Sequence, residues 1–290
     1  MPLLCRTLAL NCMYNYTRTV YKTPKGYEHE LLSLCCITKT MLGWNFNNVA
    51  ITCRERCGGM GYLAVSRFGE YIALAHSALT AEGDNRVLMS KISKDYMTNV
   101  ARHGFKVPTP TMNVHTQIAT FSDVTQLDCL LDLFKFREAT LYKSLVRSMA
   151  ALKKEGKSGF EILTRLCSDN IQDLAMAYGE RNTLEQSMLM LGSLKNAENK
   201  RVMTVAFRVF AIDTLKRDLG FYLTNKAVSA AAARALLTTQ NELIKVIAAS
   251  VEPILASLNV PHEQLHVPIA INYERYYSEP NFGEVIGARL

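Results

Sequence analysis

The stretch TAEGDN, residues 80–85, places one carboxylate, Glu82, between an apolar segment before it and a second one after it. Gly83, Asp84 and Asn85 interrupt the helical pattern there, so this turn can hold a side chain outside a helix. A carboxylate at such a turn can interact favourably with the positive N-terminal end of the following helix dipole. Alternatively, it can remove a proton from a substrate as a general base. Residue types alone leave both roles of Glu82 open. They favour the structural role at the helix N-terminus, with Asp84 or Asn85 as N-cap.

A glycine-rich turn lies upstream of this stretch. The sequence CRERCGGMGYL, residues 53–63, contains Gly58, Gly59 and Gly61. Glycine in the left-handed conformation after a helix explains such a turn structurally. Because glycine has no side chain, the same turn also lets backbone N–H groups approach a ribose or a pyrophosphate. The turn does not follow a predicted strand, so it is not the dinucleotide-binding fingerprint of parallel-sheet proteins.

Apolar residues recur along the chain at intervals of three and four, which indicates helices, rather than at intervals of two, which would indicate strands. Both turns are therefore expected to lie between helices. The sequence therefore predicts an all-α protein. Pro24 and Gly26 mark the turn between the first two helices. The expected helices cover residues 3–22, 27–56, 83–101, 126–154, 159–190, 198–222 and 225–258.

The clearest linker runs from residue 102 to residue 122. Pro108 and Pro110 stop a helix there, and the polar residues around them have no period. We therefore expect two helical domains, residues 1–102 and 126–290, joined by a linker at 103–125. The first domain carries both turns.

Composition excludes several classes of protein. The 290 residues are 49% hydrophobic and carry a net charge of +7, with basic and acidic residues interleaved, so nucleic-acid binding is not indicated. The positive charge suits a small molecule with phosphate groups, but solvated helix faces explain it equally well. The N-terminal apolar run is interrupted by Arg6, Asn11 and Arg18, and no segment predicts a membrane span.

The eight cysteines contain no CxxC pair, which favours a reducing compartment over a disulfide scaffold. Cys53 with Cys57, and His262 with His266, each have the spacing of one helical turn. Neither pair has the further ligands that zinc requires, so no metal site is expected.

Together, the two turns resemble the C-terminal half of the peroxisomal acyl-CoA oxidases, a family that reads close to CREACGGxGYL and then EGDNxVLM. The tail VPHEQLHVPIAINYERYYSEPNFGEV is also similar to the end of that family, so the resemblance covers nearly the whole chain. The matching residues are Cys53, Arg54, Glu55, Cys57, Gly58, Gly59, Gly61, Tyr62, Leu63, Glu82, Gly83, Asp84, Asn85, Val87, Leu88 and Met89.

The resemblance implies that Glu82 is a catalytic base. In the family this carboxylate removes the α-proton of an acyl-CoA thioester while the β-hydrogen leaves as hydride to the flavin of FAD. The products are a trans-2-enoyl-CoA and, after reoxidation by O2, hydrogen peroxide. Such a base needs a site that excludes water, to which Leu79, Ala81 and Val87 could contribute. The backbone N–H of Glu82 matches a family donor to the thioester oxygen.

The same match implies contacts with FAD. Glu55 and Gly59 fall where the wider acyl-CoA dehydrogenase fold touches the adenosine half of a flavin bound by the neighbouring subunit. Asp84 and Asn85 fall near its phosphate contacts. The other glycines of the two motifs are expected at the same cofactor: Gly58, Gly61 and Gly83. A homodimer is the implied assembly.

The sequence also departs from the family. Met60 stands where many relatives carry histidine, and Ala81 where many carry an aromatic residue, which leaves the acyl-chain fit and the flavin environment open. Family members begin with a helical domain and a β-barrel domain that precede the matching region. We therefore expect a fragment or short form that needs the missing N-terminal half on the same or another chain. The alternatives are a helical scaffold or dimerisation module without catalysis and, third, an acyl-CoA dehydrogenase.

The last three residues, Ala288, Arg289 and Leu290, fit the small-basic-leucine pattern of a peroxisomal address. Three loosely specified residues also match by chance at an exposed tail. The address and the family resemblance together favour the peroxisome.

Overall fold

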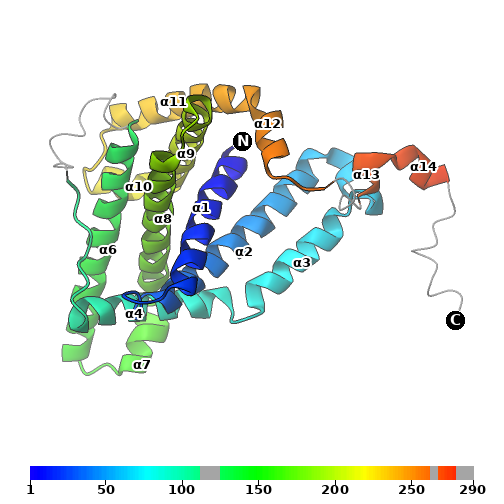
Figure 1. Ribbon diagram of the computed structural model, residues 1–290. Helices are drawn as coiled ribbons and strands as arrows, with labels where there is room; N and C mark the ends of the chain where they lie inside the picture. The colour runs from blue at the N-terminus through cyan, green and yellow to red at the C-terminus, as the bar shows by residue number, and fades with distance from the viewer. Residues whose placement is uncertain (112–124, 262–266, 279–290) are drawn as a thin grey trace, which may run out of the picture. The chain divides into compact units, whose positions relative to one another are not determined.

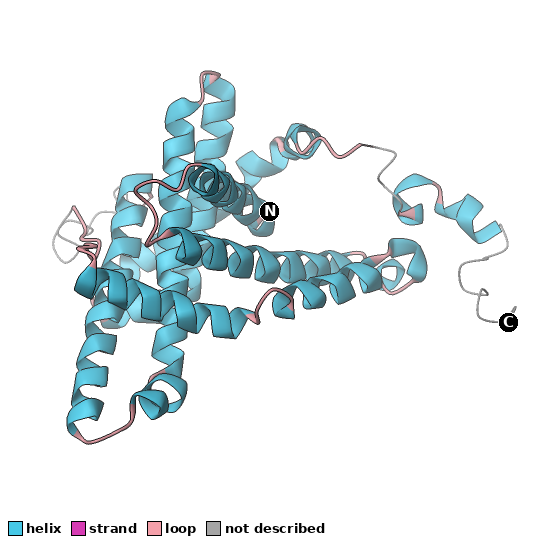
Figure 2. Cartoon of the chain, turned by 60° about the horizontal axis from the view of Figure 1, so that its bottom comes forward, coloured by secondary structure: helices cyan, strands magenta, loops and turns pink. Residues whose placement is uncertain are grey.

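A computed structural model describes residues 1–111, 125–261 and 267–278 of the chain. Every regular element in these ranges is a helix, as Figures 1 and 2 show, and the prediction of an all-α protein is confirmed. None of the described helices is both long and apolar enough to cross a membrane. The chain packs as two units: residues 1–42 with 82–250, the bundle unit, and residues 43–81 with 251–290, the turn unit.

The bundle unit is built around α8, which packs against α6, α4, α1 and α9. Its largest fully buried side chains include Phe134, Phe207 and Phe210. It also contains the first part of α2, which runs from Leu31 to Arg56. Its other helices are α1 (Pro2–Lys22), α4 (Asn85–Arg102), α6 (Leu127–Lys154), α7 (Gly159–Glu161), η3 (Ile162–Leu166), α8 (Ser168–Ser193), α9 (Ala197–Arg217), α10 (Leu219–Thr224) and α11 (Ala230–Ala249).

A glycine allows α2 and α8 to approach closely. Gly179 is buried in the middle of α8, and a Cβ added to it would lie 2.5 Å from Cγ1 of Ile37 and 2.6 Å from Sδ of Met41. Nearby, the hydroxyls of Thr17 on α1 and Thr38 on α2 are hydrogen-bonded at 2.8 Å. These contacts fix the first part of α2 inside the bundle unit.

The turn unit contains the glycine-rich turn. Pro268–Ile271, the short helix α13, packs against η2. Buried Val65 and Ser66 of η2 anchor the turn, and the Ser66 hydroxyl donates to the carbonyl oxygens of Gly61 and Leu63 at 3.1 and 2.8 Å. Its elements after α2 are η1 (Gly58–Gly61), η2 (Ala64–Ser66), α3 (Phe68–Thr80), α12 (Val251–Ser257), α13 and α14 (Tyr273–Ser278).

Three expected helices are each broken in two. The range 159–190 contains the wider turn of η3, where the Cys167 N–H donates to the Ile162 carbonyl, before α8 begins. The range 198–222 is divided at Asp218. The range 225–258 begins only at Ala230, because Ser229 caps α11 by accepting from the N–H of Ala232 at 3.1 Å, and it divides again at Ser250. Apolar periodicity continues across these breaks, so it does not reveal them.

The longest helix that was not expected is α3; the short helices α13 and α14 also lie outside the predicted ranges. Helix α3 begins after Arg67, which has a positive φ of 58° and provides no side-chain cap, so the N-cap signal is missing and only Glu70 in the first turn indicates a helix start. Its sequence, FGEYIALAHSALT, is mostly apolar, yet Ala75 is its only buried residue. Without a cap and directly after a glycine-rich turn, this segment gave too little signal to be predicted.

Candidate functional site

The turn that carries Glu82 ends at the N-terminus of α4. Asp84 is the N-cap: its Oδ1 accepts from the N–H groups of Arg86 and Val87 at 2.9 and 3.4 Å. One of the two N-cap candidates is thereby confirmed. The cap fixes the start of α4 and leaves the preceding Glu82 outside the helix.

The backbone at Glu82 is unusual. Its φ is 57°, in the left-handed region, and Gly83 follows with φ 102°. Non-glycine residues rarely adopt this conformation, which costs about 1–2 kcal/mol. The Glu82 side chain is exposed and therefore accessible to a ligand. A left-handed residue persists only where its surroundings fix it, and such residues are often found at functional sites.

Lys39 of α2 fixes this turn. Its Nζ donates to the Gly83 carbonyl oxygen and to Asn85 Oδ1, both at 2.7 Å. Asn85 is 2% exposed and donates from Nδ2 to the Thr40 carbonyl oxygen at 3.3 Å. Sequence reasoning missed Lys39, although one signal was present, because it is the only charged residue from 31 to 53.

The apolar neighbours expected to exclude water do not cover Glu82. Val87 is 66% exposed, Ala81 is also exposed and Leu79 is only half-buried. If Glu82 acts as a base, other groups must exclude water from it.

The three glycines of the other turn have three different environments. Gly58 has φ 57° and follows the end of α2, which is the left-handed glycine of a helix terminus. Gly61 is buried, and an added Cβ would lie 2.1 Å from the Arg54 carbonyl oxygen, so only glycine fits. Gly59 is exposed, with no atom within 4 Å of an added Cβ. The fold therefore does not require glycine at position 59, which leaves its backbone open to a ligand.

The surroundings of Gly59 suit a nucleotide. Tyr62 is 78% exposed, and the Arg54 guanidinium lies 6.0 Å from its ring centroid. An exposed aromatic face with one cation beside it can stack on a base and attract a phosphate. Glu55, on the last turn of α2, is exposed as well and can accept hydrogen bonds from ribose hydroxyls.

The predicted site residues thus fall into two groups. Glu82, Gly83, Asp84 and Asn85 are adjacent in the bundle unit, and Glu55, Gly58, Gly59 and Gly61 are adjacent in the turn unit. Among the described residues, no group of three potential ligands could hold a metal ion. His262 and His266 lie outside the described residues.

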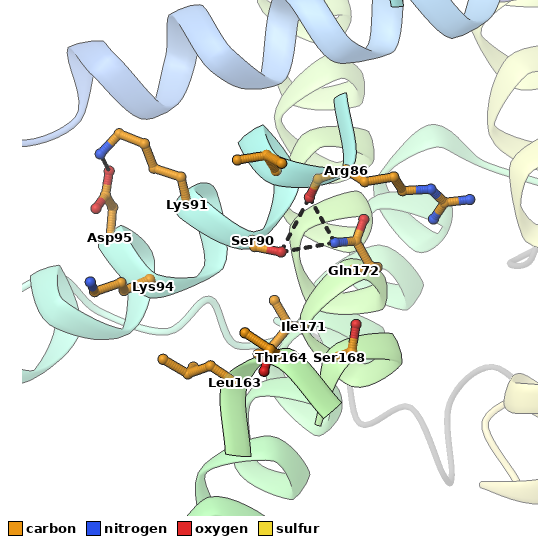
Figure 3. Close-up of a pocket in the computed structure, with 11 residues that line it drawn as sticks. Arg86, Ser90, Lys91, Lys94, Asp95, Leu163, Thr164, Ser168, Ile171 and Gln172 are labelled. Carbon is orange, nitrogen blue, oxygen red and sulfur yellow. Dashed lines mark hydrogen bonds and ion pairs between the residues drawn. The ribbon is translucent and has the colours of Figure 1, made fainter. Parts of the chain in front are cut away.

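A separate groove of about 560 Å³ runs between α4, η3 and α8 of the bundle unit (Figure 3). The side-chain amide of Gln172 crosses from α8 and donates to the Arg86 carbonyl oxygen and to Ser90 Oγ at 2.9 and 3.0 Å. Of the lysines in the groove, Lys91 forms an ion pair with Asp95 at 2.7 Å. None of the residues predicted for catalysis or FAD binding lines this groove, although Val87, which was predicted to exclude water from Glu82, does.

Comparison with known proteins identifies the same family for both parts of the chain. A family model described as "Acyl-CoA oxidase, C-alpha1 domain" matches residues 1–97, and one described as "Acyl-CoA oxidase" matches residues 126–279. The second match alone covers more than half of the chain.

Individual relatives agree with these matches. Peroxisomal acyl-coenzyme A oxidase 2 of Arabidopsis thaliana is 24% identical over 99% of this chain and 44% of its own length. The crystal structure of acyl-CoA oxidase 1 from Yarrowia lipolytica superimposes with a TM-score of 0.81 at 16% identity, over 98% of this chain and 48% of that one. A Caenorhabditis elegans acyl-CoA oxidase-2, bound with FAD, ascaroside-CoA and ATP, has a TM-score of 0.70 at 15% identity, over 86% and 40% of the two chains. The chain therefore spans less than half the length of each of these proteins.

Proposed function

The chain belongs to the acyl-CoA oxidase family, and on that premise we propose that it supplies the base and the adenosine-side surface of an FAD-dependent acyl-CoA oxidase. Its substrates are a fatty acyl-CoA and O2, and its products are a trans-2-enoyl-CoA and hydrogen peroxide. The observation that carries this proposal is the left-handed turn at Glu82, whose neighbours Gly83 and Asn85 are bound by Lys39. Arg67 precedes α3 with a similar φ of 58°, so what distinguishes Glu82 is the anchoring of the residues that follow it by the Lys39 side chain.

Glu82 removes the α-proton of the thioester in this proposal. Its carboxylate is exposed and outside any helix, so it can approach an acyl-CoA from solvent. The backbone N–H of Glu82 donates to the thioester oxygen and stabilises the negative charge that develops there. Because Ala81 and Val87 are exposed, the acyl-CoA itself or a further polypeptide must exclude water from the carboxylate.

FAD, when bound, supplies the acceptor for the β-hydrogen, which leaves as hydride. The residues of the turn unit fit the adenosine end of that cofactor, because the open backbone at Gly59 lies next to exposed Glu55 and near the exposed ring of Tyr62. Gly58 and Gly61 shape the turn that presents Gly59.

The second group of proposed FAD contacts lies beside Glu82. Asp84 caps α4, and the Asn85 amide is bonded inside the bundle unit, so any contact with a flavin phosphate comes in addition to these structural roles. Gly83 contributes through its backbone, since it has no side chain.

A complete site needs groups beyond these residues, since the chain spans less than half the length of its relatives. We propose that a second copy of this chain, or a chain with the N-terminal part of the family, supplies them. Several relatives are named as peroxisomal, and we propose the same organelle here. Ala288, Arg289 and Leu290, which would be its address, lie outside the described residues.

The decisive experiment records the visible absorbance of the purified chain and its peroxide release with a long-chain acyl-CoA. The same is done for Glu82→Gln and for Glu155→Gln, which changes an exposed acid directly after α6 and serves as control. With the N-terminal half of a relative present, we expect a flavin spectrum and peroxide release that Glu82→Gln abolishes and Glu155→Gln leaves intact. A chain that is colourless and inactive, both alone and after the N-terminal half of a relative is added, would favour the alternative of a helical scaffold without catalysis. Turnover only with an artificial electron acceptor in place of O2 would favour the dehydrogenase.

A further inference from the structure

We propose that Lys39 is the positioning residue for Glu82, acting through the turn and not through a contact with substrate. The inference rests on the proposed role of Glu82 as base. Its structural part, the anchoring of the turn, can be tested without any turnover.

The backbone of the turn requires an anchor. Two consecutive residues, Glu82 and Gly83, have positive φ values of 57° and 102°. The left-handed conformation is unfavourable for glutamate, so in isolation the turn would populate other conformations and the carboxylate would have no fixed direction. An anchor that binds the turn next to Glu82 removes these alternatives.

Lys39 is placed to be this anchor. It donates to the carbonyl oxygen of Gly83, the residue after Glu82, and to the side chain of Asn85, the first residue of α4, both at 2.7 Å. Hydrogen bonds from an ammonium group are stronger than those between neutral groups. One side chain therefore ties the turn to the helix that follows it.

The anchor itself rests on rigid structure. Lys39 is part of α2, and the adjacent residues Ile37 and Met41 pack on Gly179 of α8. Thr40 accepts from the Asn85 amide through its carbonyl oxygen, so α2 contacts the start of α4 at two successive residues. The orientation of Glu82 thus depends on the core of the bundle unit and not on the loop alone.

The chemistry explains why such an anchor matters. Abstraction of a proton from carbon requires the carboxylate oxygen to lie close to the α-hydrogen, and loss of orientation lowers the rate without weakening binding. Lys39 therefore affects kcat and leaves KM unchanged.

The test compares Lys39→Met and Lys39→Arg with a matched control, Lys143→Met, which removes an exposed lysine of α6. Hydrogen exchange of backbone amides is followed by mass spectrometry in the full chain. Lys39→Met is expected to speed exchange about tenfold or more at residues 86–88, whose N–H groups donate to Asp84, with no change in α8. Lys39→Arg is expected to restore slow exchange, because a guanidinium can donate to both acceptors. Unchanged exchange at the turn, or faster exchange throughout the bundle unit together with a lower melting temperature, would overturn the inference.

Where the wild-type chain releases peroxide and Glu82→Gln does not, the kinetic comparison follows. Lys39→Met is then expected to lower kcat at least tenfold at an unchanged KM, and Lys39→Arg to recover most of it. A raised KM at unchanged kcat would assign Lys39 to substrate binding and contradict positioning. If no variant releases peroxide even with the N-terminal half of a relative present, the proposed function fails, and the exchange result alone decides whether Lys39 anchors the turn.

Discussion

Arg137 and Glu180 form an ion pair inside the bundle unit, with Nη1 and a carboxylate oxygen 2.6 Å apart and side chains only 7% and 1% exposed. Arg217 donates to the other oxygen of Glu180, and Asp218 accepts from Arg137 at 2.7 Å. The network joins α6, α8 and the end of α9, and its central pair, Arg137 and Glu180, is buried, whereas Arg217 and Asp218 contact solvent. Removing one member of the central pair leaves its partner buried with an unbalanced charge, which is the costly outcome for such a pair.

Glu180→Gln is therefore expected to lower the free energy of unfolding by about 3 kcal/mol. The substitution keeps the volume of the side chain and removes its charge. Urea titrations followed by circular dichroism measure the change. Arg201→Ala is the control, because it breaks an exposed ion pair with Glu198 and should leave the midpoint where it is. Equal midpoints for wild type and Glu180→Gln would show that the network contributes no stability.

Acid should destabilise the bundle unit through the same residue. Burial raises the pKa of the Glu180 carboxyl, but the charges of Arg137 and Arg217 together lower it more, so the net pKa is below its ordinary value of 4.5. A carboxylate with a depressed pKa in the folded state stabilises above its unfolded pKa and loses that contribution as the pH falls through the folded value. We expect the melting temperature to be insensitive to this group from pH 7 to about 5 and to fall below about 4.5. The fall should be shallower in Glu180→Gln, and parallel curves would contradict the assignment.

Two glycines of α8 give a test of its packing. Gly179→Ala places a methyl group 2.5 Å from Ile37 and 2.6 Å from Met41, which should destabilise the chain by about 1–3 kcal/mol. Gly192→Ala, in the same helix, meets no atom within 4 Å and should be neutral or stabilise by up to about 1 kcal/mol, since alanine favours a helix. Thermal unfolding of both variants measures the difference. If the two variants, Gly179→Ala and Gly192→Ala, had the same melting temperature, the close approach of α2 and α8 would be wrong.

Gly59 and Gly61 separate cofactor binding from folding. Gly61→Ala forces a Cβ to 2.1 Å from the Arg54 carbonyl oxygen and should weaken the turn unit by about 2 kcal/mol. Gly59→Ala has free space around it and should leave stability unchanged. If the backbone there binds FAD, Gly59→Ala should still weaken binding of FAD or ADP, as measured by calorimetry. Unchanged nucleotide affinity would remove Gly59 from the proposed site.

Cysteine accessibility offers a check on both units. Cys53 and Cys57 are exposed, whereas Cys5 and Cys129 are buried. Burial raises the pKa of Cys5 to about 12, so its thiol stays protonated at pH 8 and reacts slowly. Titration with a disulfide reagent at that pH should show two fast equivalents, one of which Cys53→Ser removes. Fast labelling of Cys5 in the native chain would contradict the packing of α1.

The sequence was sufficient for the fold class, for both ends of α1 and α6 and for the C-terminal end of α2, because apolar periodicity and polar turns agree there. The start of α2 was predicted at residue 27, four residues too early, because residues 27–30 form a turn. It did not reveal the breaks at η3 and Asp218, since backbone hydrogen bonds and not composition create them. The division into domains at 1–102 and 126–290 stays a prediction.

For the site, the motif around Glu82 was visible in the sequence, but the residue that supports it was not. Lys39 is 43 residues away along the chain, and only the packing of α2 brings it to Gly83, 44 positions from it in the sequence. Likewise, the sequence does not distinguish the three glycines of the other turn, and only the atoms around them separate the open position Gly59 from the crowded position Gly61.

The positive φ of Glu82 also places selection for stability and selection for activity in opposition at one position. Glycine would adopt that backbone without a side-chain penalty, so Glu82→Gly should raise the melting temperature while it removes the carboxylate. A library screened only for thermal survival would enrich glycine or asparagine at position 82, and one screened for turnover would retain glutamate. A lineage released from catalysis would be free to drift toward the more stable residue, so the side chain at this position records which pressure has acted.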